Sequence, residues 1–256
     1  MKKVLITGAD GLIGQVLKSH LSGRYELVTH GRRSTSTADH VGDISDLAFV
    51  ETMVRETAPA AIVHLAAAAT VESEWRDVLQ ANIGGTYNVY EAARRAGVDL
   101  VVFASSNHAV GGFELEGAPA LYREDDPRVY RDTDPPWPDS LYGASKVFGE
   151  ALGRTYADRY GVRVICLRIG SVLREDDPVE AVGQGAGGWL RLSRDEMLMR
   201  YRATWLSQRD CAQLVACALE SPVRWAVAFG TSDNVRKIWD LTSAIELLGY
   251  RPQDTA

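Results

Sequence analysis

Three glycines near the start of the chain, Gly8, Gly11 and Gly14, are the feature that most constrains its fold. They directly follow the apolar residues Val4 to Ile6, which suit a strand buried on both faces. Apolar residues then recur at helical spacing, at Leu12, Ile13, Val16 and Leu17. A buried strand that turns through glycines into a helix brings the backbone and a helix N-terminus close to a pyrophosphate. The segment therefore predicts a dinucleotide-binding turn of spacing G-x-x-G-x-x-G, against the alternative of a chance glycine-rich turn.

The composition is ordinary for a globular protein, with 46% hydrophobic and 24% charged residues in a chain of 256. This length fits one large domain or one domain with a small appendage. The net charge of −6 argues against a general nucleic-acid binder. The Met-Lys-Lys start has no signal-peptide pattern, and no apolar run is long enough to span a bilayer. We therefore expect a cytoplasmic protein with neither nucleic acid nor membrane as a partner.

The three cysteines, Cys166, Cys211 and Cys217, have no C-x-x-C spacing. Each lies in an apolar setting, so we interpret them as small core residues and not as ligands or disulfide partners. The sequence predicts no metal site.

Apolar runs predict further strands at 25–30, 61–65, 100–104, 163–169 and 226–229, with helical patterns between them. This alternation predicts one α/β domain over residues 1–256, with a doubly wound, mainly parallel sheet of about seven strands, the Rossmann fold. Residues 113–140 have no clear period and predict a long loop, and residues 174–204 predict an irregular segment. We expect a small substrate lobe built from 113–140 and 174–240.

The second predicted strand ends without an acidic residue and is followed by Arg32 and Arg33. In a dinucleotide fold a carboxylate at this point binds the 2′-hydroxyl of NAD, whereas an arginine accommodates the 2′-phosphate of NADP. The two arginines therefore favour NADP, with NAD as the alternative. If they do not contact a cofactor, they are ordinary surface arginines.

Small and polar side chains follow two of the predicted strands. Ala66 to Ala69 would let a flat group approach the backbone, and Ser105 to His108 stand where parallel sheets place their ligands. His108 alone would more often be a structural histidine. Asn82 interrupts an apolar helical pattern, and periodicity alone leaves it equally well explained as a surface position.

Tyr142 and Lys146 are four residues apart at the start of a predicted helix, so their side chains share one face. An ammonium group near a phenol favours the phenolate and lowers its pKa, which makes the tyrosine usable as a base near neutral pH. Spacing alone favours an ordinary surface pair over this interpretation.

Together these segments resemble the extended short-chain dehydrogenase/reductase family over nearly the whole chain. The motifs that carry the resemblance are Thr7-Gly8-x-x-Gly11-x-x-Gly14, Asp43, His64-Leu65-Ala66, Asn82, Ser106 and Tyr142-x-x-x-Lys146. Four segments also resemble both uronate dehydrogenases and short-chain-type glucose-6-phosphate dehydrogenases: 103–111, 141–146, 167–171 and 203–207. Residues 205–211 and 248–254 are nearer to the second group.

The resemblance implies an NAD(P)-dependent sugar 1-dehydrogenase that oxidises C1 of a hexose with an anion at C6 to the lactone. The hexose would be a uronate, a hexose 6-phosphate or sulfoquinovose, and the protein would form a homo-oligomer. The implied catalytic residues are Ser106, Tyr142 and Lys146. The implied cofactor contacts are Gly8, Gly11, Leu12, Ile13, Gly14, Arg32, Arg33, Asp43, Ile44, Leu65, Ala66, Ala67, Asn82, Tyr142, Lys146 and Ile169. The implied substrate contacts are Thr70, Ser106, Asn107, His108, Tyr142, Ser171 and Arg200, with Arg200 on the C6 anion.

Two departures from the family pattern matter. Arg32 stands where both groups usually carry an acid, and the insert at 174–199 is longer than in either group. Two other functions stay open on the sequence: a sugar epimerase or dehydratase that returns the hydride, and a non-catalytic dinucleotide-sensing protein.

Overall fold

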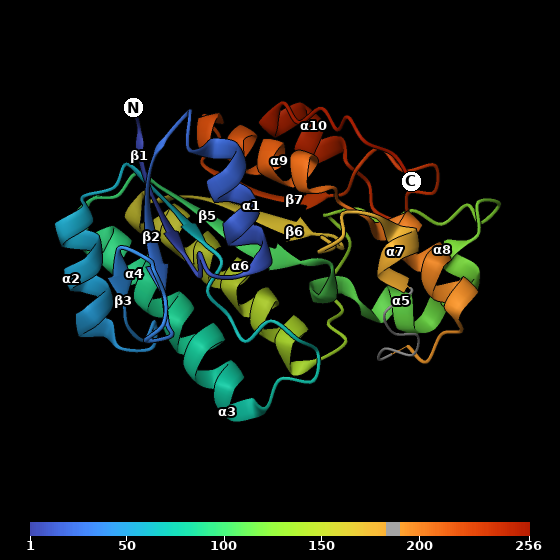
Figure 1. Cartoon of the computed structure of the whole chain (residues 1–256), viewed down its shortest axis with the longest axis horizontal. Coiled ribbons are helices and arrows are strands. Elements are labelled where there is room, and N and C mark those ends of the chain that lie inside the picture. Colours follow the sequence, from blue (N-terminus) through green and yellow to red (C-terminus); the bar gives the residue numbers. More distant parts are fainter. Residues whose placement is uncertain (183–189) are drawn as a thin grey trace.

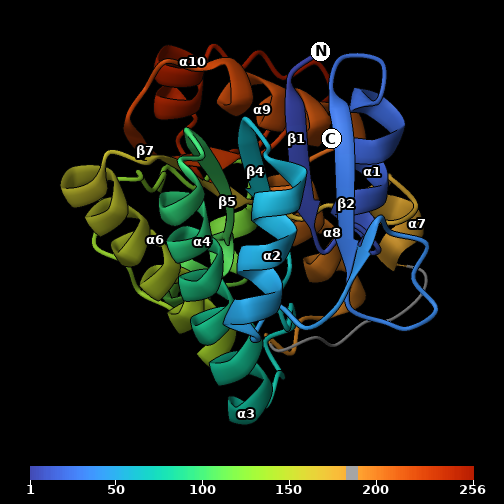
Figure 2. The same cartoon turned by 90° about the vertical axis from the view of Figure 1, so that its left-hand side faces the viewer.

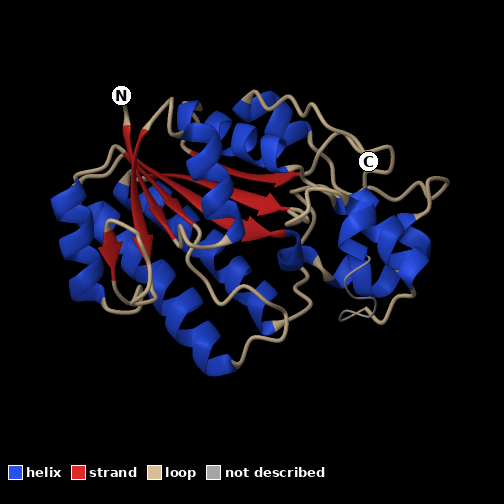
Figure 3. Cartoon of the chain, in the orientation of Figure 1, coloured by secondary structure: helices blue, strands red, loops and turns tan. Residues whose placement is uncertain are grey.

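The computed structural model describes residues 1–182 and 190–256, and it is built on a fully parallel sheet (Figures 1 and 3). In these residues the strand order is β3-β2-β1-β4-β5-β6-β7. The strands are β1 (Lys3–Thr7), β2 (Glu26–Gly31), β3 (His40–Val41), β4 (Ala61–His64), β5 (Leu100–Ser106), β6 (Arg163–Ile169) and β7 (Trp225–Gly230). The order reverses beside β1, where such sheets bind ligands at the carboxyl ends of the strands. The predicted doubly wound sheet is confirmed, and among the strands of the described residues only the two-residue β3 was not predicted.

Helices cover both faces of the sheet, as Figure 2 shows for α2, α4 and α6 on one side and α1 on the other. Successive strand residues enter different cores: Val4 and Ile6 pack on one side, while Leu5 packs on the other. The helices of the first side are α1 (Leu12–Leu21), α9 (Gln208–Glu220) and α10 (Thr242–Leu248). Those of the second are α2 (Leu47–Thr57), α4 (Gly85–Ala96) and α6 (Leu141–Tyr160). Burial of both sheet faces explains the nearly continuous apolar strands.

The segments expected to be irregular contain short helices. Residues 113–140 include most of α5 (Gly112–Gly117) and the 3₁₀ turn η3 (Ala120–Tyr122). The described part of 174–204 contains α7 (Pro178–Val182) and α8 (Arg194–Thr204), while 183–189 lie outside the described residues. These helices escaped prediction because they are short or carry polar residues on most faces. The remaining elements are α3 (Trp75–Asp77), the π-helical η1 (Val78–Gly84) and the 3₁₀ turn η2 (Asn107–Val110).

Helices α5, α7 and α8 gather beyond the carboxyl ends of the strands (Figure 1). This arrangement fits the expected substrate lobe, whose role stays a prediction. The second part of the expected lobe, 174–240, also includes α9 and β7, which pack with the sheet.

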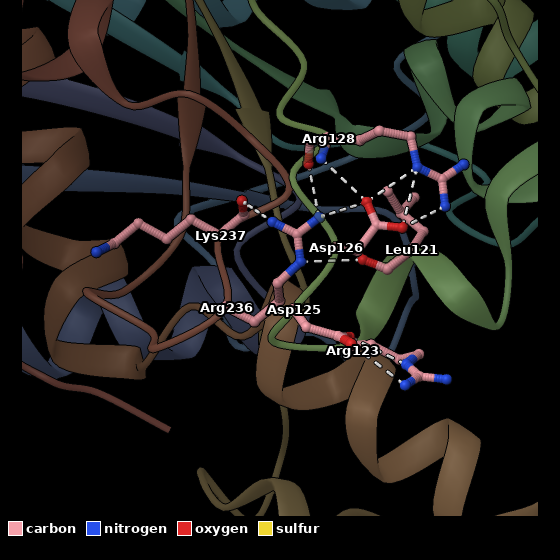
Figure 4. A network of polar contacts seen from close by, with 7 residues as sticks. All are labelled: Leu121, Arg123, Asp125, Asp126, Arg128, Arg236 and Lys237. Atoms are coloured by element: carbon pink, nitrogen blue, oxygen red, sulfur yellow. Dashed lines mark hydrogen bonds and ion pairs between the residues drawn. The ribbon is translucent and has the colours of Figure 1, made fainter.

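The buried Arg236, in the C-terminal part of the chain, binds the segment 121–128 (Figure 4). Its Nε donates to the carbonyl of Leu121 at 3.0 Å, and Nη2 donates to the carbonyl of Arg128 at 2.6 Å. Nη1 donates to the carbonyl of Lys237 at 2.7 Å, and Asp126 lies 3.7 Å from Nη2. One guanidinium therefore holds both ends of the segment 121–128.

Cys166 and Cys211 are buried and Cys217 is partly buried, and all three are free thiols. The expectation of small packed side chains is confirmed. Within the described ranges, no helix combines the length and apolar character needed to cross a bilayer. The expected homo-oligomer stays a prediction.

Candidate active site

A groove runs along the carboxyl ends of the central strands. Its larger cavity, of about 530 Å³, has the glycine turn on one side and Ser106, Tyr142 and Lys146 on the other. A second cavity, of about 320 Å³, continues toward the end of β2. The two share the lining residues Gly8, Gly11, Leu65, Ala67 and Ala69. The groove therefore connects the predicted dinucleotide turn with the predicted catalytic residues.

The three glycines of the turn serve two purposes. Gly8 has a φ of +72°, and a Cβ there would lie 2.7 Å from the amide nitrogen of Ala66. A Cβ on Gly14 would lie 2.5 Å from the Cα of Ala9. A Cβ on Gly11 would meet only the carbonyl oxygen of Gly8, at 3.4 Å. Gly8 and Gly14 are thus required by packing, whereas Gly11 leaves open space beside the N-terminus of α1. That space fits the pyrophosphate of a dinucleotide.

A buried histidine ties β1 to the end of β4. The Nδ1 of His64 is 2.8 Å from the hydroxyl of Thr7, and its Nε2 is 3.2 Å from the hydroxyl of Thr86. Burial lowers the pKa of His64 to about 3, so the ring is neutral. Thr7 also accepts a hydrogen bond from the amide of Ala66 at 3.3 Å. The network fixes the backbone of residues 64–66 against the glycine turn.

Asn82, in η1, is 2% exposed and supports the groove from behind. Its Oδ1 accepts from the amide of Ala68 at 2.7 Å. Its Nδ2 donates to the carbonyl of Ala68 at 3.1 Å and to the hydroxyl of Ser145 at 2.9 Å. The surface alternative for Asn82 is therefore wrong. Asn82 lines neither cavity, so a direct cofactor contact stays a prediction.

The helix α6 presents Tyr142 and Lys146 to the groove. The hydroxyl of Ser140 caps this helix by accepting from the amide of Gly143 at 3.0 Å. Both presented side chains are buried, and Lys146 Nζ donates to the carbonyl of Ala104 at 2.7 Å. Lys146 Nζ lies 5.3 Å from the centroid of the Tyr142 ring. Together with Ser106 at the end of β5, they form one polar cluster, so the surface-pair alternative is wrong.

The pKa values in this cluster differ from the expectation. Burial raises the pKa of Tyr142 to about 12, although a hydrogen bond with Ser106 lowers it in part. Burial lowers the pKa of Lys146 to about 8. The expected lowering of the Tyr142 pKa is therefore wrong for the protein alone. The cause is that loss of hydration disfavours the phenolate more than the neighbouring groups favour it.

The far end of the groove is lined by Asn107, His108, Ser171 and Arg200, as predicted. His108 Nδ1 lies 2.6 Å from a carboxylate oxygen of Asp139, whose side chain is fully buried, and this contact fixes the ring. The Ser171 hydroxyl is 2.8 Å from that of Thr204. Thr70, predicted with this group, is exposed near Ser73 and lines neither cavity, so its contact with a substrate stays a prediction.

Glu114 in α5 was not predicted, yet it organises this end. Its carboxylate is fully buried and accepts from Arg200 Nε at 2.7 Å and Nη2 at 3.3 Å. It also accepts from the Tyr122 hydroxyl at 2.8 Å and from Asn107 Nδ2 at 3.0 Å. Arg200 itself is 6% exposed. The cation expected to bind a substrate anion is thus paired with a carboxylate of the protein.

The other end of the groove is lined by Arg32, Arg33 and Ile44, again as predicted. Asp10, immediately before Gly11, was missed; it lines the same cavity and accepts from the Ser36 hydroxyl at 3.0 Å. Asp43 lines neither cavity; it accepts from the amide and hydroxyl of Ser45, each at 2.8 Å. The Ser45 amide is the main cause of its lowered pKa, to which Arg32 contributes less. A cofactor contact of Asp43 stays a prediction.

The remaining predicted cofactor contacts, which line one or both cavities, are Leu12, Ile13, Gly14, Leu65, Ala66, Ala67 and Ile169. Lining residues that were not predicted include His30, Gly31, Ala81, Gly170, Val172, Leu173 and Tyr201. Ser105, expected at a ligand-binding strand end, also lines the larger cavity. His30 and Gly31 end β2, and Gly170, Val172 and Leu173 follow β6, so the ends of these strands were the available signal.

Comparison with known proteins agrees with this geometry. Residues 4–226 match the model of the NAD dependent epimerase/dehydratase family. The chain is 35% identical to an NAD-dependent glucose-6-phosphate dehydrogenase of Haloferax volcanii, over 99% of this chain and 94% of that protein. It is 37% identical to an L-arabinose 1-dehydrogenase (NAD(P)(+)) of the same organism, over 100% and 98%. The crystal structure of uronate dehydrogenase from Agrobacterium tumefaciens superposes with a TM-score of 0.77 at 32% identity, covering 100% of this chain and 86% of that one.

Proposed function

The chain belongs to the NAD dependent epimerase/dehydratase family, and we propose that it is an NAD(P)-dependent sugar 1-dehydrogenase. It oxidises the hydroxyl-bearing C1 of a cyclic aldose to the lactone. The three relatives described above are named as dehydrogenases of glucose 6-phosphate, arabinose and uronate. These names include sugars with an anion at C6 and a neutral pentose, so family membership leaves the group at C6 open.

The observation that carries this proposal is the meeting of Ser106, Tyr142 and Lys146 in the groove that begins at the glycine turn. When bound in the groove, NAD(P) would supply a nicotinamide as the acceptor of the hydride. The turn at Gly11 and the small residues Ala66 to Ala69 leave room for it. A groove that joins a glycine turn to a serine, a tyrosine and a lysine favours an oxidoreductase over a binding protein.

Each residue of the cluster has a separate task. The Tyr142 oxygen acts as the general base and takes the proton of the C1 hydroxyl in its phenolate form, which the raised pKa makes the minor form in the protein alone. Ser106 holds the same sugar oxygen while charge develops on it. Lys146 places a positive charge 5.3 Å from the centroid of the Tyr142 ring and is fixed by the Ala104 carbonyl. The sugar loses one proton to Tyr142 and one hydride from C1, which balances the oxidation to the lactone.

The adenosine end of the groove supports use of NADP, in preference to NAD or beside it. Arg32 and Arg33 line this end and offer planar donors to a 2′-phosphate. Asp10 lines the same cavity, and its negative charge opposes the binding of an additional phosphate there. Loss of one charge-assisted bond corresponds to about tenfold in kcat/KM. We therefore expect Arg32→Ala to lower kcat/KM for NADP by about tenfold and to change that for NAD little. A tenfold preference of the wild type for NAD, with no effect of Arg32→Ala, would make Arg32 a surface residue.

The activity is tested by a screen of aldoses with each cofactor. The panel contains arabinose, galactose, glucose, glucuronate, glucose 6-phosphate and sulfoquinovose, each with NAD and with NADP. We expect one equivalent of reduced cofactor for each equivalent of lactone. A cofactor that copurifies with the protein and is never reduced in net terms would favour an epimerase or dehydratase instead.

A further inference from the structure

We propose that Glu114 makes the far end of the groove electrically neutral and so selects an aldose without a negative charge at C6. The substrate class is then a neutral hexose or a pentose. This inference rests on the proposed oxidation at C1. It departs from the expectation, drawn from the sequence, that Arg200 binds a C6 anion.

The first support is the way in which Arg200 is held. Both Nε and Nη2 donate to the Glu114 carboxylate, at 2.7 and 3.3 Å, in a buried bidentate ion pair. The Glu114 side chain is 0% exposed and that of Arg200 is 7% exposed. An anion that displaced Glu114 would leave a buried carboxylate without its cation, which proteins strongly disfavour. A substrate anion therefore has to bind beside the intact pair.

The second support is the charge that such an anion would meet. The pair has no net charge, so attraction to Arg200 is opposed by repulsion from Glu114. Neither charge is well screened at a buried site. Among the described residues that line the larger cavity, the other basic groups are Lys146, which donates to Ala104, and His108, which is bound to Asp139. Lys146 keeps its positive charge, but it lies beside Tyr142 in the proposed catalytic cluster, and His108 is paired with the Asp139 carboxylate.

The third support is the rigidity of the carboxylate. Glu114 accepts two more hydrogen bonds, from Tyr122 and from Asn107, and Asn107 directly follows the proposed catalytic Ser106. Tyr122 lies in the segment that Arg236 clamps at Leu121 and Arg128 (Figure 4). Glu114 is thus held in place before a substrate arrives. A sugar hydroxyl, which both donates and accepts, suits a mixed pair of this kind better than a carboxylate does.

The experiment uses sugars that share one ring configuration and differ only at C5. L-Arabinose, D-fucose, D-galactose and D-galacturonate carry hydrogen, methyl, hydroxymethyl and carboxylate there. A parallel series with the gluco configuration contains D-xylose, D-glucose and D-glucuronate. With the wild-type protein, we expect kcat/KM for the best neutral sugar to exceed that for its uronate by about tenfold or more. A wild type that prefers the uronate in both series would overturn the inference.

The variant Glu114→Gln removes the charge and keeps an oxygen that can accept from Arg200. We expect it to shift the ratio of uronate to neutral sugar by about tenfold toward the uronate. Glu116→Gln is the matched control, because it removes the same charge from an exposed position two residues away. An unchanged ratio in a folded Glu114→Gln protein would contradict the role of Glu114. If the Glu114→Gln variant does not fold, the kcat/KM ratios of the wild-type protein still test the inference by themselves.

A binding measurement separates this inference from the proposed activity. Galactose and galacturonate are titrated into the wild-type protein with NADH or NADPH, and heat is recorded. If no sugar is oxidised, the proposed function fails, yet tighter binding of the neutral sugar still supports the neutral site. Tighter binding of the uronate, or no binding of a neutral sugar, overturns the inference of a neutral site.

Discussion

The two ends of the groove recognise their ligands by different physical means. The cofactor end is lined mostly by glycines and alanines, and its arginines, Arg32 and Arg33, are exposed. The substrate end is made of buried polar side chains bound to one another, as in the pairs Glu114–Arg200 and Asp139–His108. At the first end, binding depends on space left open. At the second, it depends on hydrogen bonds already satisfied within the protein.

This difference determines which changes each end tolerates. A single added methyl group can close the cofactor end, whereas a deleted charge or oxygen disturbs the substrate end most, because buried partners are then left unpaired. The predictions below test the contrast between the two ends, in order of decreasing expected effect.

The largest effect is expected from Tyr142→Phe, which removes one oxygen where the two ends meet. Loss of a general base lowers turnover by roughly 10²- to 10⁴-fold. Affinity for the cofactor should stay nearly unchanged, because the cofactor end is shaped by backbone. Steady-state kinetics and a fluorescence titration with NADPH measure the two quantities. Tyr160→Phe is the control on the same helix, where the side chain is 49% exposed. Turnover of Tyr142→Phe within threefold of wild type would remove Tyr142 from the mechanism.

The next effect concerns the pH dependence of stability that Lys146 confers. Burial lowers its pKa to about 8, whereas an unfolded lysine titrates at about 10.4. Between these pH values the unfolded chain binds more protons, so the contribution of Lys146 to the free energy of unfolding rises with pH. The expected gain from pH 7 to pH 10.5 is on the order of 2–3 kcal/mol.

This gain should be absent from Lys146→Met, in which the site cannot titrate. Urea unfolding of both proteins across that pH range gives the difference directly, and other titrating groups cancel in it. A difference that does not change with pH would mean that Lys146 keeps an ordinary pKa in the folded protein.

The smallest effect is the difference in stability between alanine variants of Gly8 and Gly11 at the cofactor end. Gly8→Ala places a methyl group against the backbone of Ala66 at a positive φ, and we expect a loss of about 1–3 kcal/mol of stability. Gly11→Ala meets only one atom, at 3.4 Å, so stability should change by less than about 0.5 kcal/mol.

The methyl group of Gly11→Ala nevertheless occupies the space proposed for the pyrophosphate, so affinity for the dinucleotide should fall. Thermal unfolding and a titration with NADPH distinguish the two variants. Wild-type affinity in Gly11→Ala would show that the turn serves packing alone.

The cofactor end could be predicted from sequence because its signals are local. A buried strand, three glycines and a helical period lie within fifteen residues of one another, and each strand was visible as an apolar run. Tyr142 and Lys146 were found for the same reason, since four residues of helix bring them together. The direction of the Tyr142 pKa was wrong because spacing reports the nearby charge and says nothing about burial.

The substrate end could not be predicted in the same way. Glu114 and Arg200 are 86 residues apart, and His108 and Asp139 are 31 apart, in segments without a clear period. Only tertiary structure makes these pairs. Ser193 and Glu196 form a capping box, which was a local signal for the start of α8. The helix itself was not predicted because its polar sequence has no clear apolar period. The π-helical turn η1 has the same apolar pattern as an ordinary helix and could not be distinguished from one.

Asn82 has a consequence for the motions of the groove. By accepting from and donating to the same residue, Ala68, its side chain acts as a substitute for a neighbouring strand where β4 has already ended. The same amide is anchored to Ser145, whose hydroxyl donates to the carbonyl of Tyr142 at 2.6 Å. Ala68, which stands between the groove-lining Ala67 and Ala69, is therefore linked through Asn82 and Ser145 to the Tyr142 carbonyl by four hydrogen bonds, two of which join Ala68 to Asn82. A movement of residues 67–69 away from the groove and a displacement of the first turn of α6 should consequently be one cooperative event, with a shared rate.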